Sequence, residues 1–83
     1  MSQQAEALPV QPLDLRGLDP PEPMRRALEA VEALSSGEAL QIITDREPLL
    51  LYRELSRRRH PYITESGPDG FRTTIRSGGR NAS

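Results

Sequence analysis

The spacing of apolar residues changes early in the chain. Leu13 and Leu15 alternate with polar neighbours, which is typical of a short strand with one buried face. Beyond Pro21 the apolar residues recur at helical spacing, and this stripe consists of Met24, Ala27, Leu28, Val31 and Leu34. The pattern predicts a helix that starts at the prolines around Pro21 and stops before Gly37.

The middle of the chain predicts a buried strand and a second helix. Residues 39–44 favour a strand and are apolar on both faces, which indicates an interior position in a sheet. Pro48 follows Asp45, Arg46 and Glu47, and this sequence is typical of a helix start with acids near the positive end of the dipole. Pro61 prevents the helix from continuing further.

The last third predicts a hairpin. Residues 62–65 and 71–76 are strand-like, and the five residues between them are dense in turn formers. Phe71, Thr73 and Ile75 share one face of the second strand, so we expect alternate polar residues to line the other face.

The predicted element order is therefore βαβαββ. Right-handed crossover connections place both helices on one face of the sheet. We predict an α/β two-layer sandwich with a four-stranded mixed sheet, in which the first three strands are parallel and the fourth is antiparallel. The domain is expected to span residues 12–76, between a disordered N-terminal segment (residues 1–11) and a flexible tail (residues 77–83).

Composition narrows the classes of chemistry. The 83 residues suffice for one small domain with a modest core. Cysteine is absent, which excludes disulfides, thiolate catalysis and cysteine-ligated metal centres. No apolar run approaches the roughly 20 residues that span a bilayer, and the N-terminus lacks the regions of a signal peptide. We therefore expect a soluble, cytoplasmic protein without a membrane partner.

Charge is distributed unevenly along the chain. Residues 1–45 carry three arginines and eight acids, whereas residues 46–83 carry eight arginines and four acids. The net charge of −1 is thus the balance of an acidic half and a basic half. The two halves are expected either to attract each other or to present faces of opposite sign to different partners.

The segment from Leu13 to Pro23 carries a motif that resembles a known family. Gly17-Leu18-Asp19-Pro20-Pro21-Glu22-Pro23 aligns without a gap with the Gly-Leu-x-Cys-Pro-x-Pro motif of the TusA/SirA-like bacterial sulfur carriers. The resemblance covers about residues 13–76 and implies the same βαβαββ fold. Pro20 stands where that family has its sulfur-carrying cysteine, so the resemblance does not extend to sulfur transfer.

Two further motifs resemble a cysteine-free sister branch that is known only as a domain of unknown function. These motifs are Asp45-Arg46-Glu47-Pro48-Leu49 and Gly67-Pro68. Members of that branch occur alone or beside hemerythrin-like domains, and some lie near nitrogen-oxide metabolism. The resemblance therefore suggests a link to redox or nitrogen-oxide metabolism without supplying a reaction.

The first loop and helix start form the leading candidate binding site. Its residues are Arg16, Gly17, Asp19, Pro20, Pro21, Glu22 and Met24. Helix starts expose amides that bind anions, but three prolines remove donors from this turn. Asp19 also has a purely structural interpretation as a helix cap. We predict a non-catalytic protein-interaction or regulatory module that docks a protein partner here.

The basic half suggests an alternative. Arg53, Arg57, Arg58, Arg59, His60, Arg72 and Arg76 are the candidates for a basic patch that binds RNA or another nucleic acid. The near-neutral net charge and the scarcity of aromatic residues count against it. Arginines at a helix C-terminus also compensate the helix dipole.

An accessory metal-binding role is a third alternative. His60 is the only histidine, so a defined metal site would need an oligomer interface, and a surface histidine is the default expectation. We expect no cofactor, no metal site and no catalytic residues, because no paired carboxylates or nucleophile–base pair stand out. We expect a monomer or a weak homodimer.

Overall fold

The structure, a computed structural model, describes residues 12–78. Its elements are β1 (Leu13–Asp14), α1 (Glu22–Glu32), β2 (Ala39–Thr44), α2 (Leu49–Arg57), β3 (Tyr62–Gly67) and β4 (Gly70–Arg76). This order confirms the predicted βαβαββ succession. The predicted N-terminal segment and residues 79–83 of the predicted tail lie outside the described residues.

The four strands form one mixed sheet in the order β1-β2-β4-β3. β1 is parallel to β2, and β4 is antiparallel to both of its neighbours, β2 and β3. The first three strands therefore run in the same direction and the fourth runs against them, as predicted. β2 is an interior strand, which accounts for the apolar residues on both of its faces.

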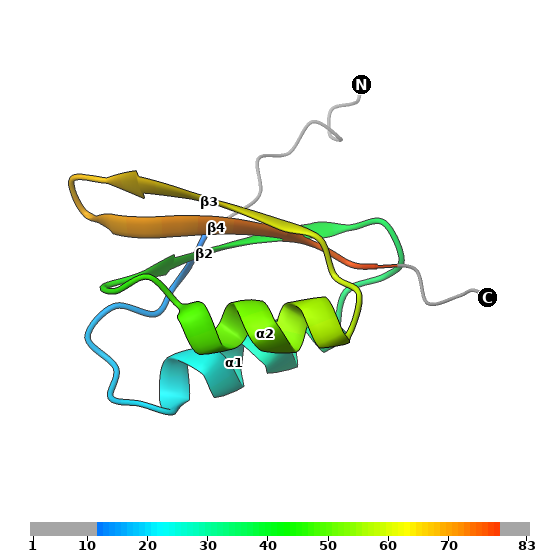
Figure 1. The fold of residues 1–83 in the computed structure, drawn as a ribbon, viewed down its shortest axis with the longest axis horizontal. Helices are drawn as coiled ribbons and strands as arrows, with labels where there is room; N and C mark the ends of the chain where they lie inside the picture. The colour runs from blue at the N-terminus through cyan, green and yellow to red at the C-terminus, as the bar shows by residue number, and fades with distance from the viewer. Residues whose placement is uncertain (1–11, 79–83) are drawn as a thin grey trace, which may run out of the picture.

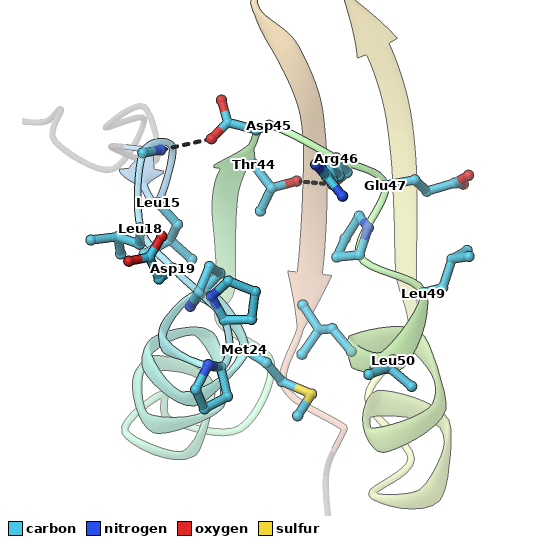
Figure 2. A pocket seen from close by; sticks show the side chains of 16 residues that line it. Leu15, Leu18, Asp19, Met24, Thr44, Asp45, Arg46, Glu47, Leu49 and Leu50 are labelled. Carbon is cyan, nitrogen blue, oxygen red and sulfur yellow. Dashed lines mark hydrogen bonds between the residues drawn. The ribbon is translucent and has the colours of Figure 1, made fainter.

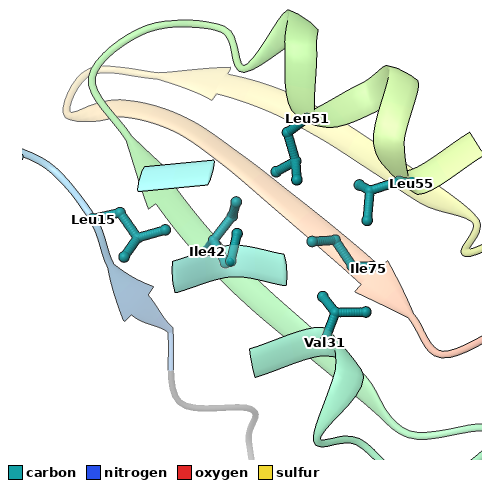
Figure 3. Close-up of a cluster of buried hydrophobic side chains, with 7 residues drawn as sticks. Leu15, Val31, Ile42, Leu51, Leu55 and Ile75 are labelled. Atoms are coloured by element: carbon teal, nitrogen blue, oxygen red, sulfur yellow. The ribbon is translucent and has the colours of Figure 1, made fainter. Parts of the chain in front are cut away.

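Both helices cover one face of the sheet, which makes the molecule a two-layer sandwich (Figure 1). The core lies between the layers and consists of Leu15, Ala27, Val31, Ile42, Leu51, Leu55 and Ile75 (Figure 3). In β4, Thr73 and Ile75 are buried towards the helices, whereas Thr74 and Arg76 are exposed. The alternation predicted for this strand is confirmed.

The end of α1 differs from the prediction, and the end of α2 has an unusual backbone conformation. α1 ends at Glu32, four residues before the predicted stop, and Gly37 instead lies in a turn closed by the Glu38 amide on the Ser35 carbonyl at 3.0 Å. Beyond α2, Arg59 takes a left-handed conformation with φ 64°, and the His60 amide donates to the Leu55 carbonyl at 2.8 Å. This is a Schellman-type ending in which arginine replaces the usual glycine.

Within residues 12–78, neither helix has the length and apolar character needed to cross a membrane.

Candidate functional site

A groove of about 640 Å³ opens where both helices begin. β1 and β2 are parallel, so their carboxyl ends, and the loops leading from them into α1 and α2, lie at the same end of the sheet (Figure 1). In α/β sheets this position is the usual place for a ligand. The lining residues are Leu15, Gly17, Leu18, Asp19, Pro20, Pro21, Pro23, Met24, Thr44, Asp45, Arg46, Glu47, Pro48, Leu49, Leu50 and Leu51.

Two hydrogen bonds fix the loops that flank the groove. The Gly17 amide donates to the Asp45 carboxylate at 2.7 Å, which ties the first loop to the second (Figure 2). The Thr44 hydroxyl donates to the Arg46 carbonyl at 2.7 Å within the second loop. Gly17 has φ 81°, a conformation that a side chain disfavours. The two hydrogen bonds and the backbone conformation of Gly17 therefore restrain both loops.

Apolar side chains at the groove remain open to solvent. Leu49 and Leu50 are 61% and 65% exposed, although they adjoin Leu51, which is 2% exposed and belongs to the core. Met24 is half-buried and extends from α1 into the space between the two helices (Figure 2). Exposed apolar residues gathered in a concave surface are typical of a binding site.

The rim of the groove carries charges without ion pairs. Among residues 12–78, Asp19, Asp45, Glu47 and Arg46 make no salt bridge, whereas most other acids do. Three acids against one arginine make the rim acidic. The Tyr52 hydroxyl lies 3.2 Å from Glu47 Oε2, and burial raises the pKa of this tyrosine.

The groove has the chemistry of a binding site rather than of a catalytic centre. Its side chains are mainly apolar, with three carboxylates, one guanidinium and one hydroxyl, and its two helix starts have Pro21 and Pro48 as N-caps. Pro20, Pro21 and Pro23 have no amide hydrogen, and the Glu22 amide already donates to the Asp19 carbonyl at 2.9 Å. The start of α1 is thus poorly equipped to bind an anion. Over residues 12–78, no group of three or more histidine, aspartate or glutamate side chains is arranged to hold a metal ion.

A family model described as "Uncharacterized conserved protein (DUF2249)" matches residues 12–77. The chain belongs to the DUF2249 family. The match covers both loops of the groove and all six elements of the fold. No curated protein matches this chain.

The DUF2249 domain brings most of the predicted site residues together. Gly17, Asp19, Pro20, Pro21 and Met24 all line the groove. Asp19 does not cap α1 through its side chain, so its structural interpretation as a side-chain cap is wrong. The Pro20–Pro21 peptide bond is cis.

Arg16 and Glu22 lie outside the groove. Arg16 donates to the Asp14 carboxylate at 2.8 and 2.9 Å and to the Asp69 carbonyl at 3.2 Å. These hydrogen bonds from Arg16 lower the pKa of Asp14 to about 2. Glu22 accepts hydrogen bonds from Arg25 and Arg26, which lower the pKa of its carboxyl. Arg16 therefore links the first loop to the turn between β3 and β4, and Glu22 stabilises the first turn of α1.

The second loop is the part of the groove that sequence reasoning missed. The motif around Pro48 was interpreted only as a helix start, and Leu49 and Leu50 were not among the predicted site residues. The prediction that β1 and β2 are parallel could have revealed this loop, because parallel strands place the loops that follow them at the same end of the sheet.

The predicted basic patch is distributed over different surfaces. Arg72 and Arg76 lie on the sheet face away from the helices, with Arg72 bonded to Asp69 and Gln41 and Arg76 to the Gly37 carbonyl. At the end of α2, Arg57 forms an ion pair with Glu54, and Arg58 forms ion pairs with both Glu54 and Glu32. Arg53 is exposed on the same helix, as is Arg59 just beyond it. Nucleic-acid binding stays a prediction.

His60 is buried, which corrects the expectation of a surface histidine. Its side chain is 9% exposed, and both ring nitrogens have partners. Nδ1 accepts a hydrogen bond from the Gly78 amide at 2.8 Å, so the ring hydrogen is assigned to Nε2, 3.3 Å from Glu32 Oε2. This histidine links α1 to the residues that follow β4, far from the groove.

Proposed function

We propose that this DUF2249 domain is a non-catalytic interaction module on a TusA/SirA-like scaffold. Its groove takes an apolar side chain from a protein partner. The observation that carries the proposal is the exposure of Leu49 and Leu50 beside a groove of about 640 Å³. An apolar anchor seated in such a groove would remove both leucines from water.

The rim charges suggest the chemistry that surrounds the anchor. Asp19, Asp45 and Glu47 favour a partner whose apolar side chain is flanked by basic residues. The motif supports the same proposal. Gly17-Leu18 and the prolines of the sulfur-carrier motif are kept, but Pro20 stands where the resembled carriers have their reactive cysteine. We further propose that the domain acts in the bacterial cytoplasm, in redox or nitrogen-oxide metabolism.

The test uses site-specific photo-cross-linking. A photoreactive amino acid at position 50 is expected to cross-link a protein in the native host, and one at position 63 is the control. Ile63 is 71% exposed, comparable to Leu50, but is distant in the sheet order on β3. The captured protein is then purified and its affinity for the domain measured by calorimetry.

Matched substitutions decide the result. Leu50→Ser and Met24→Ser are each expected to weaken binding by about tenfold, because each removes apolar contact at the groove. Ile63→Ser removes a similar exposed side chain elsewhere and is expected to leave the affinity unchanged. Capture of the same partner protein from both positions, or affinity insensitive to the two groove variants, would contradict the proposal.

A further inference from the structure

β3 is the long free edge of the sheet. In the order β1-β2-β4-β3 the two edges are β1, with two residues, and β3, with six. Natural proteins protect exposed edges with proline, lysine or a bulge. β3 contains no proline or basic residue, and Glu65 is its one charged residue. Among residues 12–78, no strand other than β4 pairs with β3, so this edge can accept another strand.

The ladder with β4 determines which backbone groups face outward. The Arg76 amide donates to the Pro61 carbonyl at 2.9 Å, and the register pairs Ile63 with Thr74 and Glu65 with Arg72. Antiparallel pairs alternate, so the amides and carbonyls of Ile63 and Glu65 point towards β4. Those of Tyr62, Thr64 and Ser66 point away from it.

We propose that β3 pairs antiparallel with β3 of a second copy of this chain. The two-fold axis passes at Thr64, so that Thr64 faces the partner's Thr64 and Tyr62 faces the partner's Ser66. The two four-stranded sheets then become one continuous sheet. This register uses all three outward-facing residues of each copy and forms about six backbone hydrogen bonds.

Side chains on the helix side of the sheet fit this symmetry. Thr64 Oγ1 lies 2.9 Å from Thr73 Oγ1 and accepts a hydrogen bond from the Tyr52 hydroxyl at 2.7 Å. Pairing at Thr64 extends this row of hydroxyls to the partner's Thr64, and opposed threonines are a favourable cross-strand pair. The stacked rings of Tyr52 and Tyr62, 4.7 Å apart, lie beside the partner's Ser66 without a clash of bulky residues.

Charges on the sheet face away from the helices select the register. Ile63, 71% exposed, faces the partner's Glu65, and Glu65 is flanked by Arg72 on its own β4. A shift that centres the axis on Glu65 would place two carboxylates directly opposite each other, which is destabilising. A shift that centres it on Ile63 would use only two of the three outward-facing residues.

The groove stays accessible in this dimer. It lies at the loops that follow β1 and β2, whereas the paired edge is β3 on the other side of β4. The dimer would thus present two grooves, and self-association does not depend on the proposed function.

Sedimentation equilibrium of the full chain over a concentration series tests the proposal. We expect the wild type to approach the mass of two chains as concentration rises. Ile63→Glu places a like charge opposite the partner's Glu65 at both symmetric positions and is expected to raise the dimer dissociation constant about tenfold or more. Far-UV circular dichroism verifies that this exposed substitution leaves the fold intact.

A charge exchange tests the register itself. Adding Glu65→Arg to Ile63→Glu pairs opposite charges across the axis and is expected to restore the dimer. Thr74→Glu adds the same charge to the same sheet face on β4, away from the edge, and is expected to leave the mass unchanged. A monomer at every concentration, a dimer indifferent to Ile63→Glu, or a failure of the double variant to restore it would overturn the proposal.

Discussion

At one end of the sandwich α1 and α2 begin beside loops with exposed leucines and unpaired acids, whereas at the other end they finish in a closed polar network. The network joins Glu32 of α1, Arg58 after α2 and His60, with N–O distances of 3.1 and 3.3 Å to Glu32. It also holds the chain after β4, because the Gly78 amide donates to His60. Both ends connect the same two helices to the same sheet.

The difference separates residues that stabilise the fold from residues available for binding. At the closed end the polar groups of His60 are buried and paired, and leaving one unpaired carries a desolvation cost. At the groove, Leu49, Leu50 and Asp19 are solvated and add little to stability, whereas Asp45 also accepts a hydrogen bond from the Gly17 amide. Substitutions at the two ends should therefore differ in kind, affecting unfolding at one end and binding at the other.

The largest expected difference in stability is between substitutions of two leucines on α2. Leu55 is fully buried, and Leu55→Ala is expected to lower the free energy of unfolding by about 2–5 kcal/mol through the cavity it leaves. Leu50→Ala, one and a half turns nearer the groove, should change it by less than about 0.5 kcal/mol. Urea denaturation measures both, and a large loss for Leu50→Ala would mean that the groove leucines are part of the core.

The next effect concerns the strap at the closed end, which is the segment Ser77–Gly78 that follows β4 and bonds to Glu38 and His60. A Cβ on Gly78 would lie in the position of the Arg59 carbonyl, so Gly78→Ala must displace this segment. The Nδ1 atom of His60 would lose its donor, and we expect a loss of about 1–3 kcal/mol. Ser77→Ala keeps the backbone bond from residue 77 to the Glu38 carbonyl and serves as the control. Equal stability of the two variants in urea would show that the strap contributes nothing.

A smaller effect is expected from one acid at the groove. Asp45→Ala removes the acceptor of the Gly17 amide and should cost about 1 kcal/mol. Asp19→Ala removes a rim carboxylate that has no hydrogen bond within the described residues and should cost less than about 0.5 kcal/mol. Thermal denaturation of the pair distinguishes them. If Asp19→Ala were the more destabilising variant, the rim would be structural rather than free for a partner.

The order of elements and their directions could be predicted because local patterns determine them. β2 was predicted at its observed bounds, since a six-residue segment with four apolar residues between turn formers has few alternatives. The end of α1 was not, because Leu34 continues the apolar stripe although the chain has already left the helix. Periodicity records which side chains face the core and not which backbone groups continue the helix.

The two ends of the molecule were not predictable to the same extent. Gly17, Asp19, Pro20, Pro21 and Met24 were singled out because their motif is contiguous. Leu49 and Leu50 join them only through the parallel pairing of β1 and β2. His60 was taken for a surface residue because its burial depends on contacts with Glu32 and Gly78, which are 28 and 18 residues away.

The smallest expected effect is a pH dependence at the closed end. Hydrogen bonds from Arg58, and then from His60, lower the pKa of Glu32 below its ordinary value of 4.5. A carboxyl with a depressed pKa in the folded state adds stability above the unfolded pKa and loses it as the pH falls through the folded value. Because Glu32 is half exposed, we expect Glu32→Gln to cost less than about 1 kcal/mol at pH 7, and less again at pH 3. Urea denaturation at pH 7, 5 and 3 measures the convergence of the two proteins. A gap that widened on acidification would reverse the sign and show that Glu32 is not held as a carboxylate by Arg58 and His60.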